Sequence, residues 1–569
     1  MKYKCIFTMI LTVTLLMALN PTTYASENKA PKIKMDVPTP SIVPMPIKMS
    51  VGKDVLIPTP EMRIITSDAS LEPLAKILAT EIGLVTKIKP NIEMNVKPNM
   101  GDIELVLIRE GKEESYKLTV EHTVKVEAKT YQGMAYGTTT LVQAFTQRNI
   151  VGKRNQKEWV LPYLTIEDEP SKSYRGVLID VARRYNSPRA LKLVIQMARF
   201  YKIRYITLHL NDDQAWTFPL KSFPKAGSKN QGFRGPSPRL YTHQELVNMV
   251  KFADERGVTL IPEIEFPAHC NSIRRVYPEY FNGYEEGKPL GLADMTNPKI
   301  YPAIQKIYAE VCNVFKSSPY IHIGCDEANI DLLKRDTEHY KKFMADRKLK
   351  NVHDLFQYFA VQLDKYAKEN GKTSLFWADG LQTWDKTRPN ELPKDMIAID
   401  WRSRYKTTVK AKQHLEAGHR VINAVWTPLY SVNMRWETLQ NLVWLNQVPD
   451  RFDGQKTAYM PKTIYEWSPY IFYKGVMEVE PTDGVIGSQM CAWESGGEIH
   501  IAALRRSLAA MAERVWNLDA GQTYEQFEKR LNMTNNQLES LIEPLNPFKW
   551  GEIDNYETKD SKEPDKNNK

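Results

Sequence analysis

Two carboxylates stand side by side in the segment IHIGCDEAN (321–329): Asp326 and Glu327 directly follow an apolar run that predicts a buried strand. Carboxylates serve as general acids, general bases and nucleophiles. An acidic pair after a strand is also typical of a solvated loop or of a helix N-terminus, where negative charge is favourable. The residues that follow the other predicted strands decide between these interpretations.

The other predicted strands end in similar residues. Carboxylates, a histidine and tryptophans stand where these strands stop, whereas a plain solvated surface predicts only scattered charges. The residues are Asp212, Asp213, Glu265, His269, Trp377, Asp379, Trp401, Trp426, Tyr430, Trp493 and Glu494. A flat aromatic face packs on a pyranose ring, and carboxylates bind its hydroxyls and protonate its oxygens. With no phosphate-binding glycine loop in the sequence, this combination points to sugar chemistry.

Strand and helix patterns alternate strictly after Pro170, which predicts the elements that position these residues. Eight apolar runs read as strands of a parallel sheet covered on both faces. They span 174–182, 204–210, 258–266, 320–325, 373–378, 396–401, 420–426 and 484–493. The fold class expected is α/β: a (β/α)8 TIM barrel, in which catalytic residues lie at the C-terminal ends of the strands. Only the stretch between the fifth and sixth strands is too short and proline-broken for a good helix.

The rest of the chain divides by composition and pattern. Before the barrel, strand-like runs flank two helical patterns, which predicts a small α+β domain. The boundaries expected are a signal peptide at 1–25, an extended lead-in at 26–53, the α+β domain at 54–170 and the barrel at 171–520 with an aromatic-rich insertion at 427–483, followed by a C-terminal segment at 521–558 and a disordered tail at 559–569.

Composition excludes several classes of protein. The first 25 residues combine two lysines, an apolar run and a small-residue site, which predicts a cleaved signal peptide and an exported protein, periplasmic or secreted. No later segment approaches 18 uninterrupted apolar residues, so we expect no membrane span. A net charge of +9 over 569 residues, without a basic cluster among aromatics, argues against nucleic acid. The four cysteines beyond the signal peptide are expected to be buried free thiols.

The spacing of the acid pair restricts its mechanism. Ordinary glycosidases place two carboxyl groups on opposite sides of the scissile bond, about 5–5.5 Å apart for retention and about 6.5–9.5 Å apart for inversion. Neighbours on one strand point to opposite sides of the chain, so Asp326 and Glu327 are poorly placed to face each other across a bond. Substrate-assisted enzymes escape this requirement, because a 2-acetamido carbonyl oxygen of the sugar acts as the nucleophile.

The chain resembles glycoside hydrolase family 20, the β-N-acetylhexosaminidases, from about residue 55 to 517. The hallmark of that family is His-x-Gly-Gly-Asp-Glu, which HIGCDE (322–327) matches except at Cys325. Further matches, in the order of the family, are RGVLIDVARRY (175–185), HLNDDQAW (209–216), PEIEFPAH (262–269) and LRRSLAAMAERVW (504–516). The domain before Pro170 is similar to the usual α+β companion of the family.

The resemblance implies a role for each site residue. Glu327 is the expected general acid/base, and Asp326 is expected to orient and polarise the acetamido group. The other expected roles are hydroxyl binding by Arg175, a relay of Asp212 and His269 to the acid, an acetamido pocket walled by Trp377, Trp401 and Trp493, a hydrogen bond from Tyr430 to the acetamido carbonyl, and a sugar contact by Glu494. The expected reaction is exo-acting removal of a terminal β-linked N-acetylhexosamine from a glycan, without a cofactor or a metal.

Three departures fall near the expected site. Glu265 stands where the family usually has Asp, Val432 replaces the acid of a Tyr-x-Asp motif, and Glu494 comes one position before the Glu of a Trp-x-Glu motif. The last two affect residues that contact hydroxyls far from the broken bond, so the preferred sugar is open while the reaction type is kept.

Two other classes of function stay open. A metal-dependent barrel enzyme would use the hard ligands Asp212, Asp213, Glu265, His269, Asp326 and Glu327. A sugar-binding protein on a hydrolase scaffold would bind a glycan without turnover. The aromatic insertion at 427–483 is expected to line extra subsites, to form a homodimer contact or to pack as a separate loop.

Overall fold

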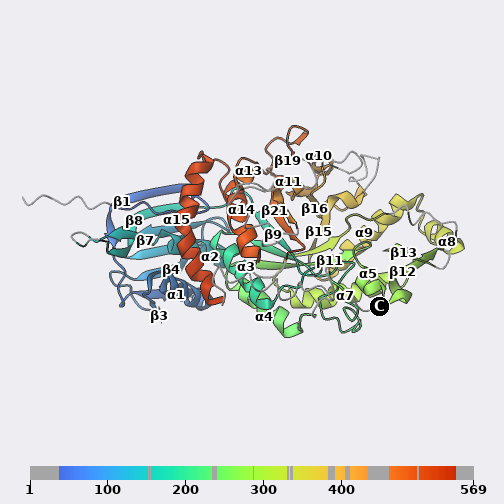
Figure 1. Ribbon diagram of the computed structural model, residues 1–569, viewed down its shortest axis with the longest axis horizontal. Coiled ribbons are helices and arrows are strands. Elements are labelled where there is room, and N and C mark those ends of the chain that lie inside the picture. The colour runs from blue at the N-terminus through green and yellow to red at the C-terminus, as the bar shows by residue number, and fades with distance from the viewer. Residues whose placement is uncertain are drawn as a thin grey trace, which may run out of the picture. The chain divides into compact units, whose positions relative to one another are not determined.

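The computed structural model describes residues 37–545, apart from 151–152, 154, 233–239, 286–287, 330–331, 333–336, 382–390, 404–409, 433–460 and 496–498. The second part of the chain folds into a parallel barrel (Figure 1). Its strands are β9 (Tyr174–Asp180), β10 (Tyr205–His209), β11 (Thr259–Phe266), β14 (Tyr320–Gly324), β15 (Thr373–Trp377), β16 (Ile397–Asp400), β17 (Arg420–Asn423) and β21 (Val485–Trp493). Each pairs with the next, and β21 pairs with both β17 and β9, which closes the barrel. The predicted TIM barrel is confirmed.

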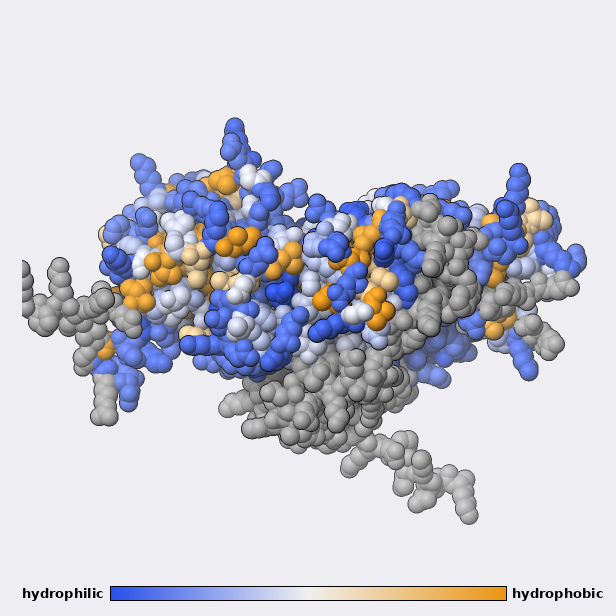
Figure 2. Space-filling view, turned by 90° about the horizontal axis from the view of Figure 1, so that it is seen from above, coloured by the Kyte–Doolittle hydropathy of each residue, from blue (hydrophilic) through white to orange (hydrophobic). Residues whose placement is uncertain are grey.

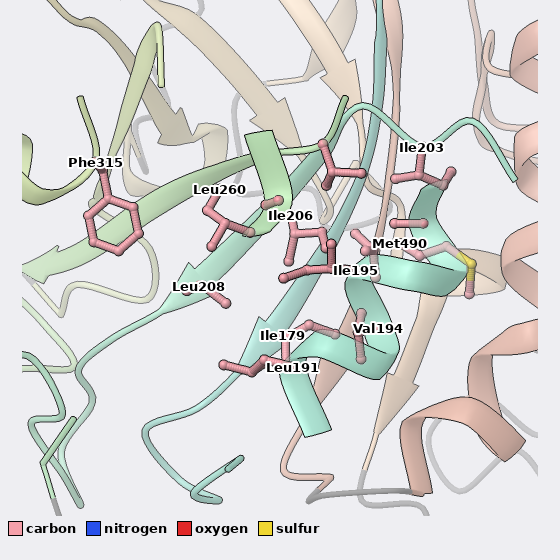
Figure 3. Close-up of a cluster of buried hydrophobic side chains, with 14 of the residues drawn as sticks. Ile179, Leu191, Val194, Ile195, Ile203, Ile206, Leu208, Leu260, Phe315 and Met490 are labelled. Atoms are coloured by element: carbon pink, nitrogen blue, oxygen red, sulfur yellow. The ribbon is translucent and has the colours of Figure 1, made fainter. Parts of the chain in front are cut away.

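Residues along each strand alternate between the barrel interior and the surrounding helices. On β9, Tyr174 and Leu178 belong to a cluster inside the barrel, whereas Ile179 belongs to the cluster that packs against the helices. Figure 3 shows this outer cluster, in which Ile179, Ile206 and Leu208 lie beside Leu191, Val194 and Ile195 of α3 (Pro188–Phe200). Both faces of the strands are therefore buried, which explains their continuous apolar sequences.

Helices follow most of the barrel strands. The longer ones are α3, α4 (His243–Asp254), α7 (Ile300–Val314), α8 (Glu338–Asp346), α9 (Val352–Glu369), α10 (Ala411–Glu416) and α14 (Ile499–Trp516). Thr242 and Glu245 form a capping box at the start of α4. Between β15 and β16 the described residues contain only the short helix η3 (Ala378–Leu381), while 382–390 lie outside them.

Short elements connect these helices and strands. They are α5 (Asn271–Arg274), α6 (Pro278–Phe281) and the hairpin of β12 (Asn282–Glu285) and β13 (Lys288–Ala293) after β11, and α11 (Trp426–Leu429), β18 (Tyr430–Val432), α13 (Pro461–Tyr465), β19 (Ile471–Tyr473) and β20 (Met477–Glu478) after β17. All four cysteines of the described residues are buried and free.

An α+β domain precedes the barrel, as predicted. Its strands are β1 (Lys48–Leu56), β2 (Arg63–Thr66), β3 (Asn91–Met94), β4 (Ile103–Leu107), β5 (Tyr116–Val120), β6 (Val124–Ala128), β7 (Thr146–Asn149) and β8 (Lys157–Asp168), and its helices are η1 (Ala69–Leu71), α1 (Glu72–Thr86) and α2 (Tyr131–Ala144). The sheet has the order β1, β8, β5, β6, β4, β2, β3, with β7 beside β8. Because β1 pairs with β8 from Lys48 onward, residues 48–53 belong to this sheet and not to the lead-in in which we placed them.

Buried ion pairs join the α+β domain to the barrel. The pairs are Arg175 with Glu114 (2.7 Å), Arg199 with Glu81 (2.8 Å) and Lys202 with Asp168 (3.0 Å). Asp168, at the end of β8, also accepts hydrogen bonds from Tyr116 Oη (2.5 Å) and Trp516 Nε1 (2.9 Å). Residues from both domains thus surround a single carboxylate.

We expect Asp168→Asn to lower the free energy of unfolding by about 3–5 kcal/mol, because it leaves the fully buried Lys202 ammonium without its anion. Urea denaturation of the purified variant measures this loss. Lys112→Gln is the matched control: it removes the surface pair of Lys112 with Glu169, which is worth about 0–1 kcal/mol. Equal losses in the two variants would contradict a special role for the buried pair.

The C-terminal helix α15 (Tyr524–Ile542) contacts both domains. Gln537 Nε2 donates to the carbonyl of Phe145, which lies in the α+β domain between α2 and β7, at 2.7 Å. Arg530 pairs with Glu513 of α14 in the barrel. η5 (Glu543–Leu545) ends the described residues. The segment after the barrel is therefore part of the structural core.

The described part of the aromatic insertion packs on the barrel helices. Tyr465 stacks on Phe527 of α15 with ring centroids 4.6 Å apart, and Arg514 of α14 donates to the Trp467 carbonyl. Trp436, Trp444 and Tyr459 of the insertion lie outside the described residues. Residues 461–478 thus behave as an outer layer of the barrel, and a homodimer contact through the insertion stays a prediction.

The surface of the described residues is mostly polar. On the face shown in Figure 2, hydrophobic side chains lie in small separate groups among hydrophilic ones. The most exposed large apolar residues, Met100 (79%) and Val476 (66%), lie in different domains. Within the part of the chain that the structure describes, no helix has the length and hydrophobicity needed to cross a bilayer.

Candidate active site

Asp326 and Glu327 converge on one histidine at the C-terminal end of the barrel. Asp326 Oδ2 lies 3.6 Å and Glu327 Oε2 lies 3.5 Å from His269 Nε2. The strand β14 already ends at Gly324, and the backbone has positive φ at Gly324 (74°), Cys325 (82°) and Glu327 (48°). Our expectation that the two carboxylates point to opposite sides is therefore wrong, because it assumed a continuing strand. Strained backbone of this kind is typical of functional sites.

A buried charge relay lies behind His269. Its Nδ1 is 3.3 Å from Asp212 Oδ2. The same carboxylate oxygen lies 2.6 Å from Arg183 Nη2 and 3.1 Å from His209 Nε2. The structure thus brings Asp212, His269 and the acid pair together, in the order that we predicted for the relay. Asp213 Oδ1 accepts a hydrogen bond from the backbone N–H of Asn271.

The charges of this relay shift the pKa values of its members. Burial opposes a charged imidazole, yet Asp326 and Asp212 raise the pKa of His269 well above 6.5. Burial likewise opposes ionisation of Asp212, but Arg183 and His269 hold its pKa well below 3.8. The hydrogen bond with His269 lowers the pKa of Glu327, and the positive charge of Arg402 acts in the same direction. His269 therefore lies between carboxylates that favour its charged form.

A second layer of polar residues lies deeper in the barrel, and its members were not among the predicted site residues. Glu263 accepts from Trp377 Nε1 (2.8 Å), and its oxygens lie 3.0 Å from His209 Nδ1 and 3.3 Å from His322 Nδ1. Burial opposes ionisation of Glu263, but these two histidines lower its pKa to about 2. Strand alternation could have predicted this layer. Glu263 and Glu265 are two residues apart on β11, so both side chains point to the same side of the strand, toward the barrel interior.

Glu265 is enclosed beside the acid pair. Its side chain is buried, and a Cβ built at Gly324 would lie 1.9 Å from Glu265 Oε2, so only glycine leaves room for it. Burial, and the charges of Asp326 and Glu263, raise the pKa of Glu265 well above 4.5. Its surroundings therefore favour the protonated form of the Glu265 carboxyl group.

Aromatic rings lie together along one side of the site. Trp401 stacks on Tyr430 with centroids 5.8 Å apart and planes 10° apart, and Tyr430 lies 6.1 Å from Trp493. Trp377 lies 6.2 Å from Trp493 on the other side. The structure therefore gathers all four predicted aromatic residues, together with Trp426, which stacks on Tyr430. Asp326 Oδ1, buried near these residues, has no hydrogen-bond partner among the described residues.

Asp379 and Arg402 link the aromatic wall to the acid. Trp401 Nε1 donates to Asp379 Oδ1 at 2.8 Å, and the backbone N–H of Glu327 donates to Asp379 Oδ2 at 3.3 Å. Arg402 Nη1 lies 3.2 Å from Glu327 Oε1 and 3.3 Å from Asp379 Oδ2. Burial, and the charge of Asp326, raise the pKa of Asp379 to about 7. Arg402, which follows Trp401 directly, was not among the predicted site residues.

Arg175 is not in the site, which corrects the prediction that it binds sugar hydroxyls. It is the second residue of β9 and fully buried, and it donates to Glu114, the Tyr136 hydroxyl and the Lys202 carbonyl toward the α+β domain. Two reasons explain this: Arg175 alternates with the inward-facing Tyr174, and it lies at the start of the strand rather than at its end. The arginine at the site is Arg183, three residues after β9.

Glu494 lies next to Arg183. Its backbone N–H donates to Asp180 Oδ2 at 3.1 Å, and Arg183 Nη1 lies 3.3 Å from the same oxygen. Burial raises the pKa of Glu494, against the charge of Arg183. Trp493, the preceding residue, has the Arg183 guanidinium 5.4 Å from its ring centroid. The predicted Glu494 therefore lies at the mouth of the site, at the C-terminal end of the barrel, with Arg183 as its neighbour.

Among the residues that the structure describes, two groups of side chains have donor atoms close enough to hold a metal ion: His209, Glu263 and Glu265, and Asp212, Asp213 and His269. In both groups the histidine nitrogens face carboxylates. Burial opposes their charged forms, but these carboxylates raise the pKa of His209 to about 9 and that of His269 well above 6.5. A metal ion in either group would have to replace the contacts of these histidines with the carboxylates of the relay.

Fold and site together define a TIM-barrel protein of the carbohydrate-active class, with an acid pair beside an aromatic wall at the C-terminal end of the barrel. Within this class, the chain belongs to glycosyl hydrolase family 20. The model of the catalytic domain of that family matches residues 173–519, and the model of its domain 2 matches residues 39–169. The predicted family is confirmed.

Relatives share this organisation at low identity. A beta-hexosaminidase of Porphyromonas gingivalis is 28% identical over 376 residues, 64% of this chain and 47% of the relative, and a beta-N-acetylhexosaminidase of Cellulomonas fimi is 23% identical over 527 residues, 87% and 93%. The chain spans about half the length of the first of these. The solved beta-N-acetylhexosaminidase of Bacteroides fragilis superposes with a TM-score of 0.71 at 20% identity, over 88% of this chain and 96% of that one. This likeness shows the fold.

Proposed function

We propose that the chain is an exo-acting β-N-acetylhexosaminidase, which removes a terminal β-linked N-acetylhexosamine from a glycan with retention of configuration. The observation that carries the proposal is the convergence of Asp326 and Glu327 on His269 beside the wall of Trp401, Tyr430 and Trp493. Two carboxylates on one side of a site suit a sugar that brings its own nucleophile.

The first step breaks the glycosidic bond. Glu327 gives its proton to the glycosidic oxygen while the carbonyl oxygen of the 2-acetamido group attacks C1, so that an oxazolinium ring replaces the C1–O bond of the leaving group. Asp326 accepts a hydrogen bond from the acetamido N–H through its unpartnered Oδ1 and stabilises the positive charge that develops. His269, held by Asp212, positions both carboxylates.

The second step releases the sugar. Glu327, now ionised, takes a proton from a water molecule, and the oxygen of that water attacks C1 and opens the oxazolinium ring. Glu327 is thereby protonated again, and the released sugar has the β configuration. Trp377, Trp401 and Trp493 would enclose the acetamido methyl group, and the Tyr430 hydroxyl would donate to its carbonyl. Arg183 and Glu494, close together at the mouth, are the proposed ligands of the sugar hydroxyls in place of Arg175.

Hydrolysis of an aryl 2-acetamido-2-deoxy-β-glucoside against the matched β-glucoside tests the proposal. We expect a preference of more than about 10³-fold for the acetamido compound, since the glucoside lacks the intramolecular nucleophile. Activity should be the same with and without a chelator. Loss of turnover on chelation would favour the metal-dependent enzyme, and binding of the sugar without turnover would favour the sugar-binding protein.

We also propose that the protein acts on glycans outside the cytoplasm. The support is the signal-peptide pattern of residues 1–25, which lie outside the described residues. Fractionation of expressing cells, with N-terminal sequencing of the mature protein, tests it.

A further inference from the structure

Both oxygens of the general acid face a cation. Glu327 Oε2 lies beside His269 Nε2 (3.5 Å), and Glu327 Oε1 lies beside Arg402 Nη1 (3.2 Å). A general acid must bring one of its oxygens, with the proton on it, to the oxygen of the leaving group. One of these two contacts is therefore replaced when substrate binds.

Arg402 is the partner that can move. His269 is held from behind by Asp212, and its imidazole turns about only two bonds. Arg402 has a long flexible side chain that lies over the ring of Trp401, with the guanidinium carbon 4.6 Å from the ring centroid, and part of it is open to solvent. It can leave Glu327 while the Trp401 ring and Asp379 keep it at the mouth.

We propose that Arg402 is a specificity-determining residue that binds an anionic substituent, a carboxylate or a sulfate, on the sugar that leaves. This rests on the proposed function, because it takes Glu327 as the acid. A group 3.2 Å from the acid oxygen would lie next to the glycosidic oxygen that Glu327 protonates, and so within reach of the sugar that leaves. A planar guanidinium matches carboxylate and sulfate oxygens with paired N–H donors.

The surrounding charges favour this assignment. Arg402 contacts both Glu327 Oε1 and Asp379 Oδ2, so without Arg402 an anionic leaving sugar placed at this point would face these carboxyl groups with no cation between them. An anion bound by Arg402 takes the place of the Glu327 carboxylate, and Glu327 then loses a cation that favours its ionised form. Binding of the anionic sugar therefore favours the protonated form of Glu327. With a neutral sugar, Arg402 stays beside Glu327 and continues to favour its ionised form.

Two disaccharides with the same terminal N-acetylglucosamine test the proposal: one β-linked to glucuronate and one β-linked to glucose. We expect kcat/KM for the glucuronate compound to exceed that for the glucose compound by about tenfold or more, and the ratio to fall to about one in Arg402→Gln. Arg402→Lys, which keeps the positive charge but lacks the paired N–H donors of the guanidinium, should retain part of the preference. A ratio unchanged in Arg402→Gln, or a wild-type preference for glucose, would overturn it.

Arg347→Gln is the matched control, because Arg347 is an exposed arginine at the end of α8 that also lies over an aromatic ring, 3.7 Å from the centroid of Phe343. It should keep the wild-type ratio. Turnover of the neutral aryl 2-acetamido glycoside is measured in parallel. Without that turnover the proposed function itself fails, whereas normal aryl turnover with no preference for the glucuronate compound refutes only the role of Arg402.

The pH profile separates this role from a structural one. Glu327 is faced by His269, Asp326, Asp379, Arg402 and, at longer range, Arg183. The basic limb of kcat/KM on the neutral disaccharide reports the loss of the acidic proton from the free enzyme. Removing the Arg402 cation raises the pKa of Glu327, so this limb should move to higher pH in Arg402→Gln by about half a unit. A limb that stays in place or moves to lower pH would overturn the proposal.

Discussion

Glu327→Gln should lower kcat on a disaccharide substrate by about 10²–10⁴-fold, which is the contribution of a positioned proton donor. The variant keeps the size of the side chain and its place beside His269 and Arg402, but it cannot transfer a proton to the leaving oxygen. Steady-state kinetics on the N-acetylglucosamine disaccharides measure the loss. With an aryl glycoside whose leaving group needs no proton, the first step should be nearly normal and the second slow, because no base activates water.

Glu338→Gln is the control for this variant. Glu338 begins α8 and its side chain is 94% exposed, so the same substitution there should leave the kinetics unchanged. Near-normal disaccharide turnover by Glu327→Gln would mean that the proton comes from another residue, and Asp326, Glu265 and Asp379 would be the next candidates.

Asp326→Asn should lower kcat on 2-acetamido substrates by about 10²–10³-fold, the usual effect of removing one group aimed at developing charge. The oxazolinium ring carries positive charge on the acetamido nitrogen, and a neutral amide can neither stabilise that charge nor accept the N–H bond as strongly. Loss of the negative charge also leaves the His269 imidazolium with one carboxylate fewer. Rates for a series of substrates with increasingly fluorinated acetamido groups measure how far the variant still depends on the attack of that oxygen.

Asp346→Asn is the matched control, since Asp346 ends α8 in an exposed pair with Lys342. Unchanged kinetics in Asp326→Asn would contradict the assisted mechanism. A general loss of folding would instead appear as altered circular dichroism and lower thermal stability, and would be seen with every substrate.

Much of the barrel could be predicted from the sequence. Parallel strands buried on both faces need long apolar runs, and eight such runs alternate with helical patterns. Polar residues follow the ends of these runs in the sequence, and closure of the barrel brings them to one rim. The edge strands of the α+β domain were harder: β3 and β7 are only four residues long and half-exposed, so they carry little apolar signal.

The errors in the site share a cause. Arg175 was chosen by its place in a motif, although its position at the start of β9 and its alternation with Tyr174 direct it to the α+β domain. The same alternation would have identified Glu263 and Glu265 as interior residues. Arg402 had no signal, because an arginine after a tryptophan has no special pattern, and its contact with Glu327 joins residues 75 positions apart.

The sequence by itself determined the barrel, the family and the identity of the acid pair, because these depend on local apolar runs and on residues within a few positions of one another. Only the tertiary structure decided which charges share a neighbour. The turn after β14 brings Asp326 and Glu327 to one imidazole, and barrel closure adds Arg183, Asp379 and Arg402 from three other strand ends. Electrostatic energy depends on distance through space, so pKa values and pairings follow from the fold and not from the order of residues.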